Sequence, residues 1–199
     1  MRSKKKVLML VLCGVLLVGA SILGTMAYLT SQDQVNNTFT VGDVAITLDE
    51  SKVNANGEKE GQTRVKQNTY HLMPGHSYTK DPIVHVTAGS DESFVFVKLE
   101  NGLKDIVADK TIEAQIIANG WEQLKDKQNK DVPGVYYRSV EKSATATDLT
   151  VFESFKVKDD VGNTTLKNYA DAKITVTAYA VQADGFDNAA DAWSSTFGE

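Results

Sequence analysis

Cysteine is almost missing from this chain, and it is missing entirely beyond residue 13. Cys13, the single cysteine among 199 residues, lies in the middle of an apolar run. The rest of the chain therefore has no disulfide and no thiol nucleophile. We interpret Cys13 as one more apolar residue of its run. Stability must come from a hydrophobic core or from assembly with other chains.

Positive charge is in deficit once the start of the chain is set aside. Four of the 21 basic residues lie within the first six positions, so 17 basic residues face 26 acidic ones and the net charge is −9. A surface of that sign repels nucleic acid and anionic lipid. No basic cluster that would bind phosphate follows residue 27. We therefore expect neither nucleic acid nor a membrane surface as a partner of the folded domain.

Catalytic motifs are also absent. The sequence has no GxSxG element, no GxxxxGK loop and no HExxH pair. His71, His76 and His85 lie within 15 residues, and zinc takes histidine and carboxylate ligands. Their spacing, however, places them on separate strands and a turn. We expect ordinary surface histidines, with no metal, no cofactor and no catalytic residues.

Two groups of aspartates are candidate calcium ligands. They are Asp159 with Asp160, and Asp184 with Asp187 and Asp191. Neither matches the twelve-residue loop that binds calcium in EF-hands. A solvated acidic face is therefore the favoured interpretation of both groups.

The first thirty residues have the order of a secretory signal. Basic residues at positions 2–6 precede an uncharged run over 7–29, and small residues gather near its end. Thr25 and Ala27 supply small side chains at the two positions that a signal peptidase must accept. We predict cleavage between Ala27 and Tyr28. The alternative is an uncleaved anchor, because 23 uncharged residues are long enough to span a bilayer.

The clearest strand in the sequence covers 37–49. Apolar residues recur at every second position from 44 to 48, which is the period of a half-buried strand. Phe39 and Val41 fall on the opposite parity. A bulge at Gly42 would bring both sets to one core.

Further strands are predicted by the same alternation and by the turn residues between them. They cover 70–72, 82–87, 93–101, 120–124, 135–140, 149–157 and 173–182. The four apolar residues 94–97 predict a strand covered on both faces. Short helices are predicted over 111–120 and 186–193, where apolar residues recur at helical spacing. Residues 51–67 are polar with alternating charges, so a loop is expected there.

Turn residues divide these elements. Residues 88–91 predict one hairpin between their flanking strands, and 125–134 predict another. Eight or so strands with one or two short helices predict an all-β fold, a jelly-roll or Greek-key β-sandwich preceded by a signal peptide. We expect the signal peptide over 1–27, a flexible N-terminal segment over 28–38 that could act as a donor strand, and the sandwich over 39–199.

Several short motifs are spread over most of the chain. They are GTMAYLT at 24–30, NTFTVG at 37–42, VAITL at 44–48, MPG at 73–75, TKDP at 79–82, FVFVK at 94–98 and AYAVQADGF at 178–186. Together they resemble the TasA/camelysin family of exported proteins of Gram-positive bacteria. The last motif is similar to clostridial members that carry a SipW-type signal peptide.

The resemblance implies a jelly-roll domain outside the cell, released by a SipW-type signal peptidase. For the best-known members it implies fibres of the biofilm matrix, in which the N-terminal segment of one mature subunit completes the sheet of the next. By position, the assembly residues would be Tyr28, Leu29, Val35, Phe39 and Val41. This chain departs from the family pattern in lacking a long acidic or lysine-rich tail and in being shorter than the main fibre protein.

Three functions follow from these residues, in order of preference. The first is a secreted structural protein of the extracellular matrix or cell surface, whose partners are copies of itself or related matrix proteins. Exposed strand edges recruit further strands and would support such assembly. The second is a monomeric surface binding module with Trp121 or Trp193 in a glycan groove, although core packing is commoner for such residues. The third, a secreted metallopeptidase of camelysin type, has no supporting motif.

Overall fold

The computed structural model describes residues 30–34, 37–39, 44–108 and 111–198, with backbone alone at 30–34, 37–39 and 111. The predicted cleavage site between Ala27 and Tyr28 lies outside these ranges. So do four of the five predicted assembly residues, Tyr28, Leu29, Val35 and Val41. Phe39 is described only as part of a strand.

The described strands form three antiparallel sheets, so the fold is all-β, as the sequence predicts. The six-stranded sheet has the order β2 (Asn37–Phe39), β1 (Thr30–Gln34), β12 (Ile174–Gln182), β7 (Ser93–Asn101), β9 (Asp131–Val140) and β8 (Glu122–Lys125). The four-stranded sheet has the order β10 (Thr147–Thr150), β6 (Ile83–Val86), β3 (Ile46–Val53) and β4 (Lys59–Val65). The third sheet pairs β11 (Ser154–Lys156) with β5 (Ser77–Thr79).

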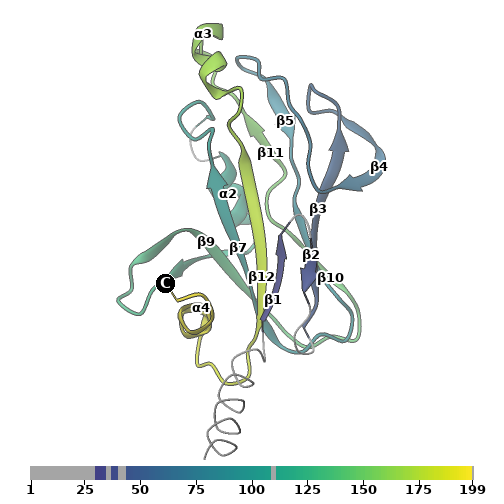
Figure 1. Cartoon of the computed structure of the whole chain (residues 1–199), viewed down its shortest axis with the longest axis vertical. Coiled ribbons are helices and arrows are strands. Elements are labelled where there is room, and N and C mark those ends of the chain that lie inside the picture. Colours follow the sequence, from purple (N-terminus) through teal and green to yellow (C-terminus); the bar gives the residue numbers. More distant parts are fainter. Residues whose placement is uncertain (1–29, 35–36, 40–43, 109–110, 199) are drawn as a thin grey trace, which may run out of the picture.

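The two larger sheets share one hydrophobic core. Leu48 and Val84 enter it from the four-stranded sheet, and Val97, Val176 and Ala178 enter it from the six-stranded sheet. Each of these residues lies on the buried parity of its strand, with partly exposed neighbours on either side in most cases. Figure 1 shows β12 running through the middle of the molecule, with β7 on one side and β1 along part of the other.

The described part of the chain has three short α-helices where the sequence predicts one or two. They are α2 (Thr111–Ala118), α3 (Asn163–Leu166), which continues into a 3-10 turn over Lys167–Tyr169, and α4 (Ala189–Phe197). Both predicted helices are confirmed as α2 and α4. The third, α3, is only four residues long and buries a single side chain, so it has no helical periodicity to detect. Among the helices in the described part of the chain, none is long and apolar enough to cross a membrane.

Helix α4 covers a second, aromatic core on the outer face of the six-stranded sheet. Trp193 packs against Phe96 and Phe197, with ring centroids 5.1 Å and 4.5 Å away. Tyr179 on β12 meets the same indole edge-on at 5.6 Å. This explains why the apolar run over 94–97 is buried on both faces of β7, as its sequence predicts.

The predicted loop over 51–67 is wrong. Strand β3 continues to Val53, and β4 returns antiparallel to it over Lys59–Val65. Because β4 is an edge strand with little burial on either face, its sequence carries no apolar alternation. Charged side chains pair across the hairpin, including Lys52 with Glu60 at 3.1 Å.

One predicted hairpin and two predicted strands also differ from the structure. Residues 88–91 form a turn, but it leads from β6 in one sheet to β7 in the other, so no hairpin forms there. The predicted strand over 149–157 is divided into β10 and β11, because Val151 and Phe152 are both fully buried and break the alternation. Residues 70–72 form no strand. The hairpin of β8 and β9 is confirmed, with its turn at 126–130 rather than at Pro133.

Candidate functional site: a groove beside a half-covered strand edge

The described strands cover only half of one edge of β12. Its residues 178–181 pair with 30–33 of β1, whereas no described strand pairs with Ile174–Thr177 on that side. The other edge of β12 pairs with β7 along its full length. In Figure 1, β1 is seen beside the lower part of β12 and ends before the upper part. Among the described residues, Ile174–Thr177 is therefore an open sheet edge next to the core.

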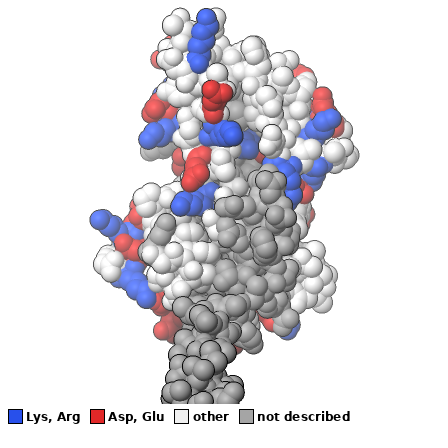
Figure 2. Space-filling view, viewed as in Figure 1, with Lys and Arg blue, Asp and Glu red and all other residues white. Residues whose placement is uncertain are grey.

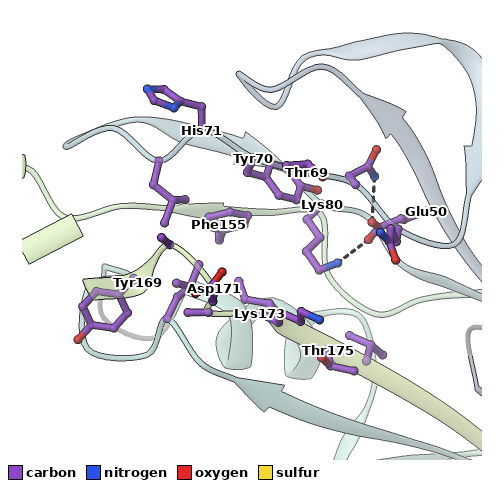
Figure 3. A pocket seen from close by; sticks show the side chains of 18 of the residues that line it. Glu50, Thr69, Tyr70, His71, Lys80, Phe155, Tyr169, Asp171, Lys173 and Thr175 are labelled. Carbon is purple, nitrogen blue, oxygen red and sulfur yellow. Dashed lines mark hydrogen bonds and ion pairs between the residues drawn. The ribbon is translucent and has the colours of Figure 1, made fainter. Parts of the chain in front are cut away.

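A groove of about 1290 Å³ lies beside this open edge. Its walls come from Ile174–Val176 of β12, from Leu48–Glu50 of β3, and from the connecting segments 66–73 and 166–173 (Figure 3). Its lining is mixed. The apolar side chains include Leu48, Leu72, Leu103, Phe155, Leu166, Ile174 and Val176, and the polar ones include Glu50, Lys66, Asn68, Lys80, Asp171 and Lys173. An unpaired backbone edge next to apolar side chains is what an added β-strand requires, and here polar side chains are interspersed among the apolar ones.

A buried ion pair closes one part of the groove. Glu50 is 4% exposed, and its Oε2 accepts a hydrogen bond of 2.6 Å from Lys80 Nζ (Figure 3). The other carboxylate oxygen, Oε1, accepts from Asn68 Nδ2 at 2.9 Å. Burial, together with the negative charges of Glu50 and Asp81, raises the pKa of the nearby Tyr70 hydroxyl, which donates to Thr79 O at 3.0 Å.

A charged cluster lies on the outer face of the four-stranded sheet. His85 on β6 bridges two carboxylates, with Nε2 3.0 Å from Asp49 Oδ1 and Nδ1 2.6 Å from Asp148 Oδ1. Burial disfavours a charged His85, but the hydrogen bonds with both carboxylates outweigh burial and raise the pKa of the imidazole. Burial likewise disfavours a charged Asp49, yet Arg64 and His85 hold the pKa of its carboxyl below the usual range.

Asp81 ties β3 to the segment that enters β6. Its two carboxylate oxygens accept from the backbone N–H of Ser51 at 2.7 Å and from the Ser51 hydroxyl at 2.8 Å. Lys59 Nζ donates to the same carboxylate at 2.7 Å. Burial opposes ionisation of Asp81, but these three donors keep its pKa below the usual range. We interpret Asp81 and the His85 cluster as structural clamps of the sheet.

The three histidines do not gather into one site. His71 is exposed at the groove, and His76 hydrogen-bonds the backbone oxygen of Asn56 at 2.8 Å and stacks edge-on against Tyr78. His85 belongs to the charged cluster on the opposite face of β6 from the core. Within the described ranges, no three His, Cys, Asp or Glu residues lie close enough together to hold a metal ion.

The candidate calcium ligands take part in local contacts. The backbone N–H of Asp191 donates to the Asn188 side chain at the start of α4, and its carboxylate pairs with Lys127 at 3.1 Å. The carboxylate of Asp159 pairs with Lys156 at 3.0 Å. Trp121 and Trp193, the candidate glycan contacts, are 1% and 3% exposed and belong to the two cores.

Sequence reasoning missed Glu50, Lys80 and Asn68. One signal was present, because Glu50 continues the inward parity of Ile46 and Leu48 and so places a carboxylate at a core position. An acidic residue on the buried parity needs a partner. The identity of that partner depends on how segments thirty residues apart are arranged, which no local pattern reveals.

On the face that Figure 2 shows, Lys and Arg lie interspersed with Asp and Glu, and no patch of a single charge stands out. Comparison of the chain with protein-family models, with curated proteins and with solved structures gave no match in any of the three.

Proposed function

We propose that this protein is a secreted structural protein of the extracellular or biofilm matrix, and that it assembles into fibres by β-strand addition. The observation that carries this proposal is the edge of β12 over Ile174–Thr177, which no described strand covers and which lies beside a groove that contains apolar side chains. An unpaired edge presents N–H and C=O groups that a strand from another molecule satisfies. The groove would accept the inward-facing side chains of that strand.

The N-terminal segment is the strand that we propose to be exchanged. Its residues 30–33 pair with residues 178–181 of their own β12, the covered half of the same edge, so this segment already fits that edge next to the open half. A donor role requires β1 to leave its own β12 and to pair with the same residues of a neighbour. Because the two pairings are equivalent, such an exchange costs little beyond the opening step. We interpret the arrangement in which β1 pairs with its own β12 as the closed form of the monomer.

Three further proposals accompany this one. The two sheets that share a core are of jelly-roll type, the leader is removed by a SipW-type signal peptidase after Ala27, and the role is structural rather than catalytic. N-terminal sequencing of protein recovered from culture medium tests the second and should yield a start at Tyr28. Casein hydrolysis that is abolished by a chelator would contradict the third.

A disulfide between β1 and β12 tests the assembly mechanism. Ser31 and Ala180 are register partners, and paired residues of adjacent strands are close enough for such a bond. We expect the oxidised Ser31→Cys/Ala180→Cys variant, in a Cys13→Ser background, to remain monomeric at concentrations where the wild type forms fibres. Reduction should restore fibres, as followed by light scattering and electron microscopy.

The matched control joins two strands that remain together in every form. Thr177→Cys/Lys98→Cys links β12 to β7 at another register pair and should leave assembly unchanged in both redox states. Fibres of the oxidised β1–β12 variant would overturn the strand exchange. A wild type that stays monomeric at every concentration would instead favour a monomeric binding module, whose ligand would occupy the groove lined by Tyr70 and Tyr169.

A further inference from the structure

The groove continues the path that β1 already follows. Strand β1 pairs with residues 178–181 of β12. The groove lies just beyond them on the same edge, between Ile174–Val176 of β12 and Leu48–Glu50 of β3. In Figure 1, β1 runs beside the lower part of β12 and points toward the upper part. A strand that entered the groove along β12 would therefore be a direct continuation of β1.

The chain leaves this path where β2 turns back. Strand β2 runs antiparallel to β1, with Gln34 opposite Asn37, and the chain then enters β3 of the same molecule at Ile46. In the closed monomer, this reversal brings the chain back toward β3. When β1 is bound to a neighbour, the chain has to run from that neighbour to its own β3. The reversal then has no role.

The register of β1 assigns a partner to each residue that follows it. Residues 30–33 pair with 178–181 in antiparallel register. Continued without a shift, the same register pairs 34–37 with Ile174–Thr177. The continuation therefore ends where β12 itself begins, and it covers the whole stretch that no described strand pairs with on this side.

The one apolar side chain of this continuation falls opposite the apolar part of the edge. The continued register places Val35 opposite Val176, and such partners project to the same face of the sheet. Val176 is buried in the shared core and lines the groove, whereas Thr175 and Thr177 on either side are only half-buried. Because Val35 is the only apolar residue of 30–38, a shift by one residue would turn it to the other face.

We propose that the strand exchanged between molecules is longer than β1. The pairing of β1 with β2 opens, and residues 30–37 of one molecule pair with Ile174–Val181 of the next, so that 34–37 fill the groove. This inference rests on the strand exchange proposed above and specifies its register.

The longer strand supplies a driving force for assembly. Exchange of 30–33 alone replaces one pairing with an identical one, so it gains nothing. Opening the hairpin loses the three register pairs between β1 and β2. Pairing of 34–37 with Ile174–Thr177 forms four pairs in their place, and it also buries the side chain of Val35 against the groove.

Cysteine pairs test the register. In a Cys13→Ser background, oxidised fibres of Val35→Cys/Val176→Cys should give a ladder of disulfide-linked oligomers on a non-reducing denaturing gel. The matched control, Val35→Cys/Thr175→Cys, should give about tenfold less linked product, because neighbouring side chains of a strand point to opposite faces. Equal ladders would overturn the register. A link within single chains in dilute solution would overturn the proposal, because the molecule's own segment would then fill the groove.

Single substitutions test the apolar contact. Val35→Ser should raise the critical concentration for fibre growth by about tenfold, because it removes the apolar side chain that the groove would bury. Asn36→Ser is the matched control and should leave the critical concentration unchanged, since position 36 faces the other side of the sheet. Equal critical concentrations for the two variants would overturn the proposed fit.

A disulfide between β1 and β2 separates the longer strand from strand exchange itself. Asp33→Cys/Thr38→Cys, also in the Cys13→Ser background, joins a register pair of the hairpin and leaves 30–33 able to pair with β12. Circular dichroism confirms that each variant is folded. We expect the oxidised variant to remain monomeric at concentrations where the reduced variant forms fibres. The reduced variant carries the same substitutions and so controls for them.

Fibres of the oxidised hairpin variant would overturn the longer strand and leave strand exchange intact. Failure of the wild type and of every reduced variant to form fibres would overturn both.

Discussion

At the scale of single residues, His85 joins three strands of the four-stranded sheet. Its ring reaches Asp49 on β3 and Asp148 on β10 from its own position on β6. Arg64 on β4 extends the same cluster by binding Asp49. The stability of this sheet should therefore depend on whether the imidazole carries a proton.

We expect a specific pH dependence from His85. Its pKa is raised above the ordinary value of 6.5, so the contribution of the charged ring is complete below 6.5 and is lost as the pH rises through the folded-state pKa. The free energy of unfolding of the wild type should fall by about 1 kcal/mol more than that of His85→Gln across this rise. Urea unfolding at a series of pH values measures the difference.

The exposed His71 supplies the control for this experiment. His71→Gln removes an imidazole from a position outside the cluster and should preserve the wild-type pH profile. A His85→Gln profile parallel to that of the wild type would show that the bridge to Asp49 and Asp148 has no effect on stability.

The two tryptophans make a second comparison at the same scale. Both are buried, but Nε1 of Trp121 donates to Thr150 O at 2.8 Å, whereas Nε1 of Trp193 has no partner among the described residues. Trp121→Phe should therefore cost about 1–2 kcal/mol more than Trp193→Phe, because it alone breaks a hydrogen bond. Chemical denaturation of both variants tests this, and equal losses would contradict it.

At the scale of elements, β9 depends on a glycine within it. Gly134 has a φ of +71°, and a Cβ there would lie 2.5 Å from Leu99 O of the adjacent β7. Gly134→Ala should destabilise the protein by about 2–4 kcal/mol, because it combines backbone strain with a clash. Gly61→Ala is the control, with a φ of +73° and no atom within 4 Å. Equal melting temperatures for the two variants would exclude the clash.

The sequence predicts an element well where one face is buried and the other is not. Apolar alternation located β6 and β12, a continuous apolar run located β7, and helical spacing located α2 and α4. The same rule missed β4, because an edge strand that is exposed on both faces has no alternation of apolar and polar residues. It also joined β10 to β11, because Val151 and Phe152 continue an apolar run that leaves the sheet.

The site was harder to predict than the strands. The groove lies beside the half of β12 that β1 does not cover, and no single segment of the sequence predicts the lengths of two strands relative to one another. The cluster of Glu50, Lys80 and Asn68 comes from three segments brought together by sheet register. Only the buried parity of Glu50 was visible beforehand.

At the scale of the whole molecule, like charge opposes assembly. The sequence beyond residue 27 carries a net charge of −9, and each copy therefore repels the next. Raising the salt concentration from about 20 mM to about 200 mM shortens the Debye length and should speed fibre growth. Light scattering measures the rate, and sucrose at equal osmolality controls for non-ionic effects. A rate that is unchanged or lower in salt would contradict this expectation.

The position of β1 on its own β12 has a kinetic consequence. A strand tethered to the edge that it fills competes at an effective concentration of roughly millimolar. Newly made molecules would thus stay unassociated while dilute, and growth would begin with a lag until a few open copies formed an end. Once such an end existed, β1 of each added molecule would leave its own β12 as that molecule joined the fibre. Short preformed seeds should therefore abolish the lag.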